Sequence, residues 1–296
     1  MKIYLLFRLP AIATLIAYLF LRNNSDARWE YDLVLFNLVA LLAALSIALS
    51  PILDDPLGRA GVVGAIITWS AGSITSSLDS FFEINTPLDL ELIAQSFYAL
   101  FYPLAIFGLT RAIRFKTVSK SLELLDTSII AIGYTTILTA LLVRPAMTTI
   151  DGSIFDVFLA ILYPVGDIVI LVLVLLLVLR QSMSWRNGLI LIGATIFFLS
   201  DFYFLYQSYL GNYEFGSLTD VGWLISFIFL SQAFWSANNE ELAARSFNSV
   251  VATIALLGSS TLLAIAVLQP SYIPRFLILP AFVTIALSFL RMGVAI

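Results

Sequence analysis

The sequence contains no cysteine and no histidine, and only 11% of its residues are charged. Without those two side chains, the chain cannot form disulfide frameworks, ordinary zinc sites, imidazole-ligated haem, or Ser-His and Cys-His nucleophiles. Its lysines, Lys2, Lys116 and Lys120, all lie in predicted flanks or loops, which excludes a retinal Schiff base inside a membrane span. No basic stretch is large enough to bind nucleic acid. We therefore expect no cofactor, no metal and no nucleic-acid partner.

The composition is instead that of a membrane protein. Hydrophobic residues make up 60% of the chain and the mean hydropathy is +1.00. A soluble domain has about 25% charged residues. Apolar stretches of about 18 residues or more recur along the whole length, each long enough to cross a bilayer as a helix. We therefore predict an all-α fold, a polytopic membrane helical bundle with the lipid bilayer as its first partner.

The apolar stretches predict about ten transmembrane helices in a single integral membrane domain over residues 1–296. The first is interpreted as a retained span because Arg8 interrupts its apolar run and no cleavage site follows before Arg22. The predicted spans are 3–21, 33–53, 61–80, 90–110, 122–143, 155–179, 188–209, 220–237, 248–268 and 276–294.

The distribution of basic residues predicts the orientation of these spans. Placing the N-terminus and the even-numbered loops in the cytoplasm puts eleven of the 15 basic residues inside. The loop 111–120, RAIRFKTVSK, dominates that count. The four basic residues left outside are Arg22, Arg28, Arg144 and Arg275. Both termini are therefore expected in the cytoplasm.

A short internal repeat supports an even number of spans. The segments FYALFYPLAIF (97–107) and FLAILYPVGDI (158–168) match when Tyr102-Pro103 is aligned with Tyr163-Pro164, an offset of 61 residues. A weaker match relates 156–165 to 220–229, an offset of 64 residues. An offset of one helical hairpin preserves direction through the membrane, so the sequence predicts parallel hairpin repeats.

Acidic residues inside predicted spans are the strongest functional signal. Asp156, Tyr163 and Asp167 fall within a narrow arc of one helix face, and a carboxylate facing lipid costs several kcal/mol. Asp201 in the next span is expected at the same depth as Asp167, on an adjacent helix, with no basic residue at that level. Two such acids share a site most cheaply when it holds a proton, a metal cation or an organic cation.

The residues around this acid pair predict a polar pocket that opens outward. Pro164 removes a backbone donor and Gly166 permits close approach of a ligand. Tyr203, Tyr206 and Trp223 offer aromatic faces, which suit organic cations. The candidate ligand-binding residues are Asp156, Tyr163, Asp167, Asp201, Tyr203, Tyr206, Asp220 and Trp223. The candidate hinge residues are Pro103, Pro164 and Gly166.

Structural roles compete with these functional ones. Intramembrane polar side chains often hold helices together, at about 1 kcal/mol per contact. Asp156 and Asp220, near the outer ends of their spans, are also placed to cap a helix start. Asp126 is placed to cap its helix or to pair with Lys116 or Lys120.

Three short motifs resemble a known family. In the polytopic N-terminal sensor regions of bacterial GGDEF/EAL diguanylate cyclases and phosphodiesterases, the motifs read Tyr-Pro-x-x-Asp, then Asp followed by aromatics, then Asp-x-x-Trp. The likeness spans roughly 122–235, and the matching residues here are Tyr163, Pro164, Asp167, Asp201, Tyr203, Asp220 and Trp223.

The resemblance implies a sensory module in the bacterial inner membrane, whose last helix leads to a cytoplasmic output domain or a homodimer partner. Cyclic-di-GMP turnover would belong to that output part, since this chain carries no GGDEF or EAL sequence. The chain itself is therefore expected not to be an enzyme.

Three functions compete at this point. The first is a membrane sensor that binds a small or cationic ligand from the outer side. The second is a secondary transporter, which also uses midspan carboxylates and broken helices. Against it, the inner half of the sixth span (168–179) is a closed aliphatic run. The third is an intramembrane aspartyl protease, whose Gly-x-Gly-Asp motif is incomplete in VGD (165–167).

Overall fold

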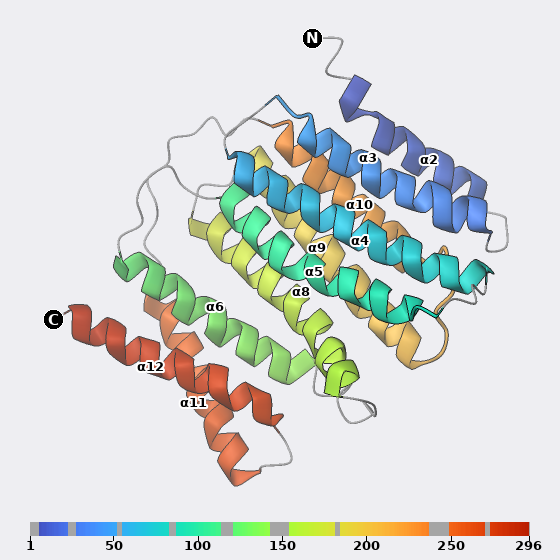
Figure 1. The fold of residues 1–296 in the computed structure, drawn as a ribbon. Coiled ribbons are helices and arrows are strands. Elements are labelled where there is room, and N and C mark those ends of the chain that lie inside the picture. The colour runs from blue at the N-terminus through green and yellow to red at the C-terminus, as the bar shows by residue number, and fades with distance from the viewer. Residues whose placement is uncertain are drawn as a thin grey trace. The chain divides into compact units, whose positions relative to one another are not determined.

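The computed structural model describes residues 6–22, 28–51, 55–82, 87–113, 121–142, 154–180, 184–236, 249–269 and 273–295 (Figure 1). Within these ranges the fold is all-helical. The α-helices are α2 (Pro10–Arg22), α3 (Phe36–Ala48), α4 (Pro56–Phe82), α5 (Leu90–Ala112), α6 (Ser121–Leu142), α8 (Ile154–Arg180), α9 (Trp185–Tyr209), α10 (Leu218–Phe234), α11 (Ser249–Leu268) and α12 (Ile278–Ala295). A π-helical segment η1 (Glu30–Leu35) leads directly into α3, and a 3₁₀ turn η2 (Arg275–Leu277) precedes α12.

Each of the ten predicted spans coincides with one of these described α-helices. Five of the helices are long and apolar enough to cross a membrane: Glu30–Ala48, Pro56–Phe82, Leu90–Ala112, Ile161–Val178 and Trp185–Ser208. Shorter apolar helices are Pro10–Arg22, Leu125–Leu141, Leu218–Phe234 and Thr253–Leu268. The helical fold and its membrane character are therefore confirmed, while ten crossings and the hairpin repeat stay predictions.

The chain divides into two compact units. Unit 1 comprises Met1–Ile113 and Met183–Glu240, and unit 2 comprises Arg114–Ser182 and Glu241–Ile296. Unit 1 therefore contains α2 to α5 together with α9 and α10, and unit 2 contains α6, α8, α11 and α12. The single domain over 1–296 stays a prediction.

In unit 1, α4 and α5 pack so closely that glycine is required on both sides. A Cβ added at Gly61 would lie 2.8 Å from the Cα of Gly108, and one at Gly108 would overlap the backbone at Val62. Because such contacts leave no room for a methyl group, the two helices touch backbone to backbone. Small residues give the same kind of close approach between helices in membranes, where the hydrophobic effect does not drive association.

The interior of unit 1 is aromatic. Trp69 of α4 is 5% exposed. Its indole lies 4.9 Å from the ring of Phe227, 5.6 Å from that of Trp223 and 5.7 Å from that of Phe36, measured between centroids. These partners come from α10 and from the start of α3. One tryptophan therefore joins three helices at the centre of the unit.

Contacts between helix ends gather at the two ends of unit 1. At one end, the ring of Trp29 lies 6.0 Å from that of Phe82, and the ring of Phe81 lies 5.2 Å from that of Phe215. These rings bring together the segment before α3, the last residues of α4 and the loop before α10. The charge distribution predicts that this end faces outward, and we call it the outer end.

The opposite, inner end is held by a second set of polar contacts. Trp235 donates from Nε1 to the Ser46 hydroxyl at 2.9 Å. Arg8 donates from Nε to the side-chain oxygen of Gln232. These contacts tie the end of α10 to α3 and to the residues just before α2.

An ion pair at this inner end links α4 to α5. Arg111 lies 2.9 Å from Asp55, which also accepts hydrogen bonds from the backbone N–H groups of Leu57 and Gly58 at 3.0 Å each. Desolvation acts to raise the pKa of the Asp55 carboxyl, but the hydrogen bonds from Gly58 and Arg111, with the arginine charge, together bring that pKa below its ordinary value. Asp55 therefore caps α4 as an anion.

Unit 2 has a close-packed centre and an ion pair between helix ends. A Cβ added at Gly133 of α6 would lie 2.8 Å from the Cβ of Ala255 and 3.1 Å from the Thr284 methyl, so α6 closely contacts both α11 and α12. The start of α6 and the end of α12 are joined because Arg291 donates to Asp126 at 2.8 Å. Asp126 thus pairs with Arg291; Lys116 and Lys120, the partners considered from sequence, lie outside the described residues.

Exposed aromatic residues mark helix ends in unit 1. Trp29, which precedes η1, is 45% exposed, and Trp185, which begins α9, is 74% exposed. Tryptophan is enriched at the level of lipid headgroups, where its ring meets hydrocarbon and its N–H meets water. Together with the exposed leucines, isoleucines and phenylalanines of the apolar helices, these positions are consistent with contact to a lipid bilayer.

Candidate functional site

Asp201 is held by side chains from two other helices of unit 1. Its Oδ1 accepts a hydrogen bond from Trp223 Nε1 of α10 at 2.6 Å, and its Oδ2 accepts one from the Tyr102 hydroxyl of α5 at 3.3 Å. Tyr102 is 4% exposed and Trp223 is 8% exposed. We call these three residues the Asp201 cluster; both of these donors are neutral groups.

Close packing of α9 on α10 brings this acid to its tryptophan. A Cβ added at Gly222 would overlap the hydroxyl of Ser200. Gly222 precedes Trp223, and Ser200 precedes Asp201, so the helices approach most closely beside the cluster. A larger residue at position 222 would separate the indole N–H from the carboxylate.

Aromatic rings surround the Asp201 cluster. Phe101, next to Tyr102 in the chain, stacks on Phe197 with centroids 4.8 Å apart. On the outer side, the ring of Phe204 lies 5.4 Å from that of Trp223 and 4.7 Å from that of Tyr213. A carboxylate among aromatic faces is a combination suited to a small organic cation, which gains both ionic and cation–π contacts.

The structure places the other candidate residues of α9 on its surface. Tyr203 is 41% exposed and Tyr206 is 59% exposed, whereas Trp223 is buried against Asp201. The Tyr203 hydroxyl accepts a hydrogen bond from Gln207 Nε2 at 2.6 Å, within its own helix. Of the three aromatic residues proposed to line the site, the structure therefore brings only Trp223 to Asp201 by a described hydrogen bond. A lining role for Tyr203 and Tyr206 stays a prediction.

The candidates of the sixth predicted span lie in α8 of unit 2. Asp167 is 2% exposed, Pro164 and Gly166 are also buried, and Tyr163 is partly buried. The side chain of Asp156 lies outside the described part of the chain. Burial of Asp167 agrees with the prediction that this acid avoids lipid.

Asp167 and Asp201 belong to different compact units. Each is therefore described within its own unit, and their pairing at matching depth stays a prediction. Pro164 and Pro103 both lie inside helices that continue beyond them, so neither proline ends its helix. Their roles as hinges stay predictions, as does that of Gly166.

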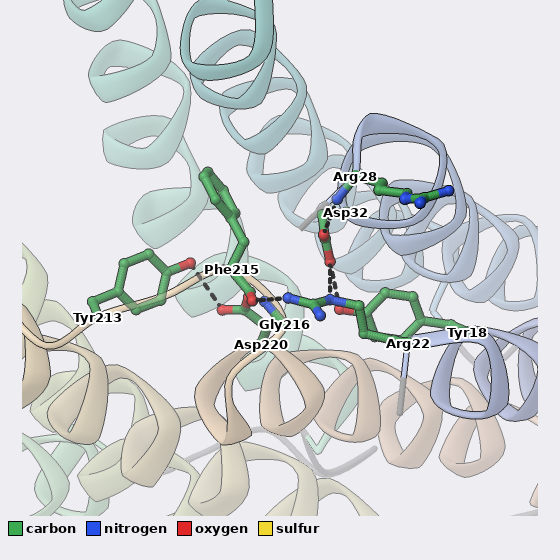
Figure 2. Close-up of polar contacts among 8 residues, drawn as sticks. All are labelled: Tyr18, Arg22, Arg28, Asp32, Tyr213, Phe215, Gly216 and Asp220. Carbon is green, nitrogen blue, oxygen red and sulfur yellow. Dashed lines mark hydrogen bonds and ion pairs between the residues drawn. The ribbon is translucent and has the colours of Figure 1, made fainter. Parts of the chain in front are cut away.

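A second polar cluster occupies the outer end of unit 1 (Figure 2). Arg22, at the end of α2, donates from Nε to Asp32 Oδ1 at 2.9 Å and from a terminal nitrogen to the carbonyl of Phe215. Asp32 also accepts from the Tyr18 hydroxyl at 3.3 Å and from the backbone N–H of Arg28 at 3.0 Å. Tyr18 is fully buried and Asp32 is 3% exposed. We call Arg22, Asp32 and the Phe215 carbonyl the Arg22 latch.

Asp32 belongs to the π-helical segment η1. π-helical turns occur mostly as single insertions and are frequent at functional sites. In this turn the Asp32 carboxylate reaches back to accept the Arg28 N–H while it faces Arg22. Figure 2 shows the side chain of Arg28 pointing away from this contact.

Asp220 orders the loop that follows α9. This acid is 3% exposed and accepts hydrogen bonds from the Tyr213 hydroxyl at 3.0 Å and from the Gly216 N–H at 2.6 Å. Burial, and then the nearby Asp220 charge, raise the pKa of Tyr213 above its ordinary value, so the phenol stays a donor. Asp220 thus has the structural role of fastening the chain at a helix start, as its position in the sequence suggested.

Sequence reasoning missed three residues of these clusters. Tyr102 carried little weight because no acid follows it in the chain, yet its acid is supplied by α9. Arg22 was counted from the sequence as an outside basic residue, and Asp32 was not singled out. The signal for them was the short loop itself, which places an arginine and an aspartate ten residues apart on consecutive helices.

The described residues contain no group of three acidic side chains that could hold a metal ion. Among described contacts, Asp201 receives its hydrogen bonds from the indole N–H of Trp223 and the phenol of Tyr102. Comparisons with protein-family models, curated proteins and solved structures find no match to this chain.

Proposed function

We propose that this chain is a membrane-embedded sensory domain that binds a small organic cation from the outer side. It passes the signal to a cytoplasmic output such as cyclic-di-GMP turnover. The cation side of the proposal is carried by the Asp201 cluster, and the output side by the motif resemblance to GGDEF/EAL sensor regions.

The single observation that supports ligand binding is a carboxylate held among aromatic rings from three helices. Asp201 accepts from Trp223 and Tyr102, so both of its oxygens are oriented by neutral donors. Because the donors belong to α5 and α10, a ligand that draws the carboxylate toward itself would change how both helices pack on α9. Signalling requires such a difference in ligand affinity between two packings.

Thermal unfolding in detergent tests the binding step with tetramethylammonium and choline as probes. A ligand that binds only the folded state stabilises it by RT ln(1 + [L]/Kd), about 2.7 kcal/mol at a hundredfold excess over Kd. We expect either probe to raise the melting temperature of the wild type and to leave Asp201→Asn unchanged. Sodium chloride at equal concentration controls for ionic strength.

Asp79→Asn is the matched control because it removes an exposed carboxylate near the outer end of α4. It should keep the full response to the probe. Identical unfolding curves for wild type and Asp201→Asn, with and without each cation, would contradict the binding proposal.

The output step is tested by joining the C-terminal end of the chain to a diguanylate cyclase domain. We expect the cation that stabilises the wild type to change the rate of cyclic-di-GMP synthesis, and the Asp201→Asn fusion to lose that response. A cyclase rate that ignores a cation already shown to bind would refute the output assignment and leave the binding site standing.

A further inference from the structure

The loop 210–217 joins the two helices that hold Asp201 and Trp223. It begins after α9 ends at Tyr209, and it ends where α10 begins at Leu218. Asp201 lies eight residues before the end of α9, about 12 Å along a helix. The loop therefore lies at the outer end of the same helix pair that forms the candidate site.

Aromatic contacts connect this loop to the site. Tyr213 of the loop packs against Phe204, and Phe204 packs against Trp223, with centroid separations of 4.7 Å and 5.4 Å. A single ring thus separates the loop from the indole that donates to Asp201. Tyr213 and Phe204 therefore lie between the outer end of this helix pair and Trp223.

The loop is held by a residue of its own helical hairpin and by a residue of another helix. Asp220 binds its Tyr213 hydroxyl and Gly216 N–H, which belong to the same hairpin. Arg22, from α2, instead binds the Phe215 carbonyl and is held in place by Asp32. The Arg22 guanidinium is therefore the described polar side chain that ties the loop to the first two helices. Its side chain is 17% exposed, so it is reachable from solvent while its partner Asp32 is not.

Building on the proposed function, we propose that the Arg22 latch holds the loop 210–217 closed over the Asp201 cluster, and that cations reach Asp201 only when the latch opens. Release breaks the two contacts that define the latch, the one to Asp32 and the one to Phe215. The internal contacts of Asp220 keep the loop folded while it moves. The latch thus controls the access of cations to Asp201, and none of its residues belongs to the Asp201 cluster.

The absence of native cysteines allows this to be measured with a single reporter thiol. Ser200→Cys places the thiol between α9 and α10, one residue before Asp201 in the chain, at a position that is 8% exposed. The probe is the trimethylammonium-ethyl methanethiosulfonate reagent, itself a small organic cation, and mass spectrometry follows the modification rate. We expect slow modification with Arg22 present and at least about tenfold faster modification with Arg22→Gln, the change expected when one charged hydrogen bond no longer favours the closed form.

Two controls make each outcome decisive. Arg28→Gln removes a neighbouring positive charge whose side chain is not part of the latch, and it should leave the rate at Ser200→Cys unchanged. Ser231→Cys reports from a fully buried position toward the inner end of α10, and its rate should stay slow with Arg22→Gln.

An unchanged rate at Ser200→Cys with Arg22→Gln would overturn the latch. Equal acceleration at Ser231→Cys would overturn it as well, because Arg22 would then hold the whole unit rather than the loop. Neither result bears on the tetramethylammonium response of Asp201, so failure of the latch and failure of the proposed function are distinguishable.

Discussion

Replacing Gly216 by alanine should open the Arg22 latch without removing any of its polar groups. Gly216 adopts φ 78°, and a Cβ there would overlap the Arg22 guanidinium. Gly211, in the same loop, adopts φ 69° and has open space where its Cβ would be placed. The two glycines therefore share the backbone strain of an alanine substitution, and only one of them adds a collision with Arg22.

The magnitudes follow from these two terms. An alanine in the left-handed region costs about 1–2 kcal/mol, and the lower entropy of the unfolded chain offsets about 0.4–1 kcal/mol of that. Gly211→Ala should therefore lower the free energy of unfolding by about 1 kcal/mol. Gly216→Ala should lose in addition the charged hydrogen bond from Arg22 to Phe215, about 1.5–3 kcal/mol. We expect the two variants to differ by about 2 kcal/mol.

The assay is reversible unfolding in mixed micelles of increasing SDS content, followed by circular dichroism. A double-mutant cycle isolates the collision. In an Arg22→Gln background the guanidinium is gone, so Gly216→Ala should cost no more than Gly211→Ala. A difference of about 2 kcal/mol that persists in this background would refute the reasoning, because it would then arise from the backbone alone.

Three further perturbations test other contacts. Trp223→Phe keeps an aromatic ring but removes part of the indole, including the N–H that binds the carboxylate of α9. It should cost at least about 1–3 kcal/mol in SDS unfolding, and a neutral result would show that the hydrogen bond is dispensable. Arg291→Gln breaks the pair with Asp126, whose side chains are 42% and 22% exposed, so a loss below about 1 kcal/mol is expected and a loss above about 2 kcal/mol would require further partners. The pKa of Asp55 is lowered by its hydrogen bonds, including that from Arg111. Its contribution to stability is therefore complete above its unfolded pKa of about 3.8 and is lost as the pH falls below that value. Asp55→Asn should be less stable than the wild type at about pH 6 and should lose less stability between about pH 5 and pH 3 in thermal unfolding; equal losses in the two proteins would contradict this assignment.

The positions of the helices could be predicted because each apolar run has the length of a helix and is bounded by polar residues. The described helices fall on all ten predicted spans. In unit 1, successive helix ends lie alternately at the outer and the inner end, as short loops between consecutive helices require. Burial of Asp167 could also be predicted, since the cost of exposing a carboxylate to lipid does not depend on the details of packing.

The partners of the acids could not be predicted in the same way. Tyr102 and Asp201 are 99 residues apart, and their contact depends on how α5 and α9 pack within unit 1. Glycines set the close α4–α5 and α9–α10 contacts of that unit. Periodicity identifies the face of a helix but not its neighbour. A close approach set by Gly222 leaves no more trace in the sequence than any other glycine in an apolar run.

Helix α10 is anchored at both surfaces of unit 1. Asp220 is bound in its first turn. At 1.5 Å per residue, Gln232, which contacts Arg8, lies about 18 Å along the helix, and Trp235, which donates to Ser46, about 22 Å. Because contacts hold α10 at both ends, one end of the helix cannot rotate independently of the other. A rotation of its outer end would therefore also strain the Trp235–Ser46 hydrogen bond at its inner end.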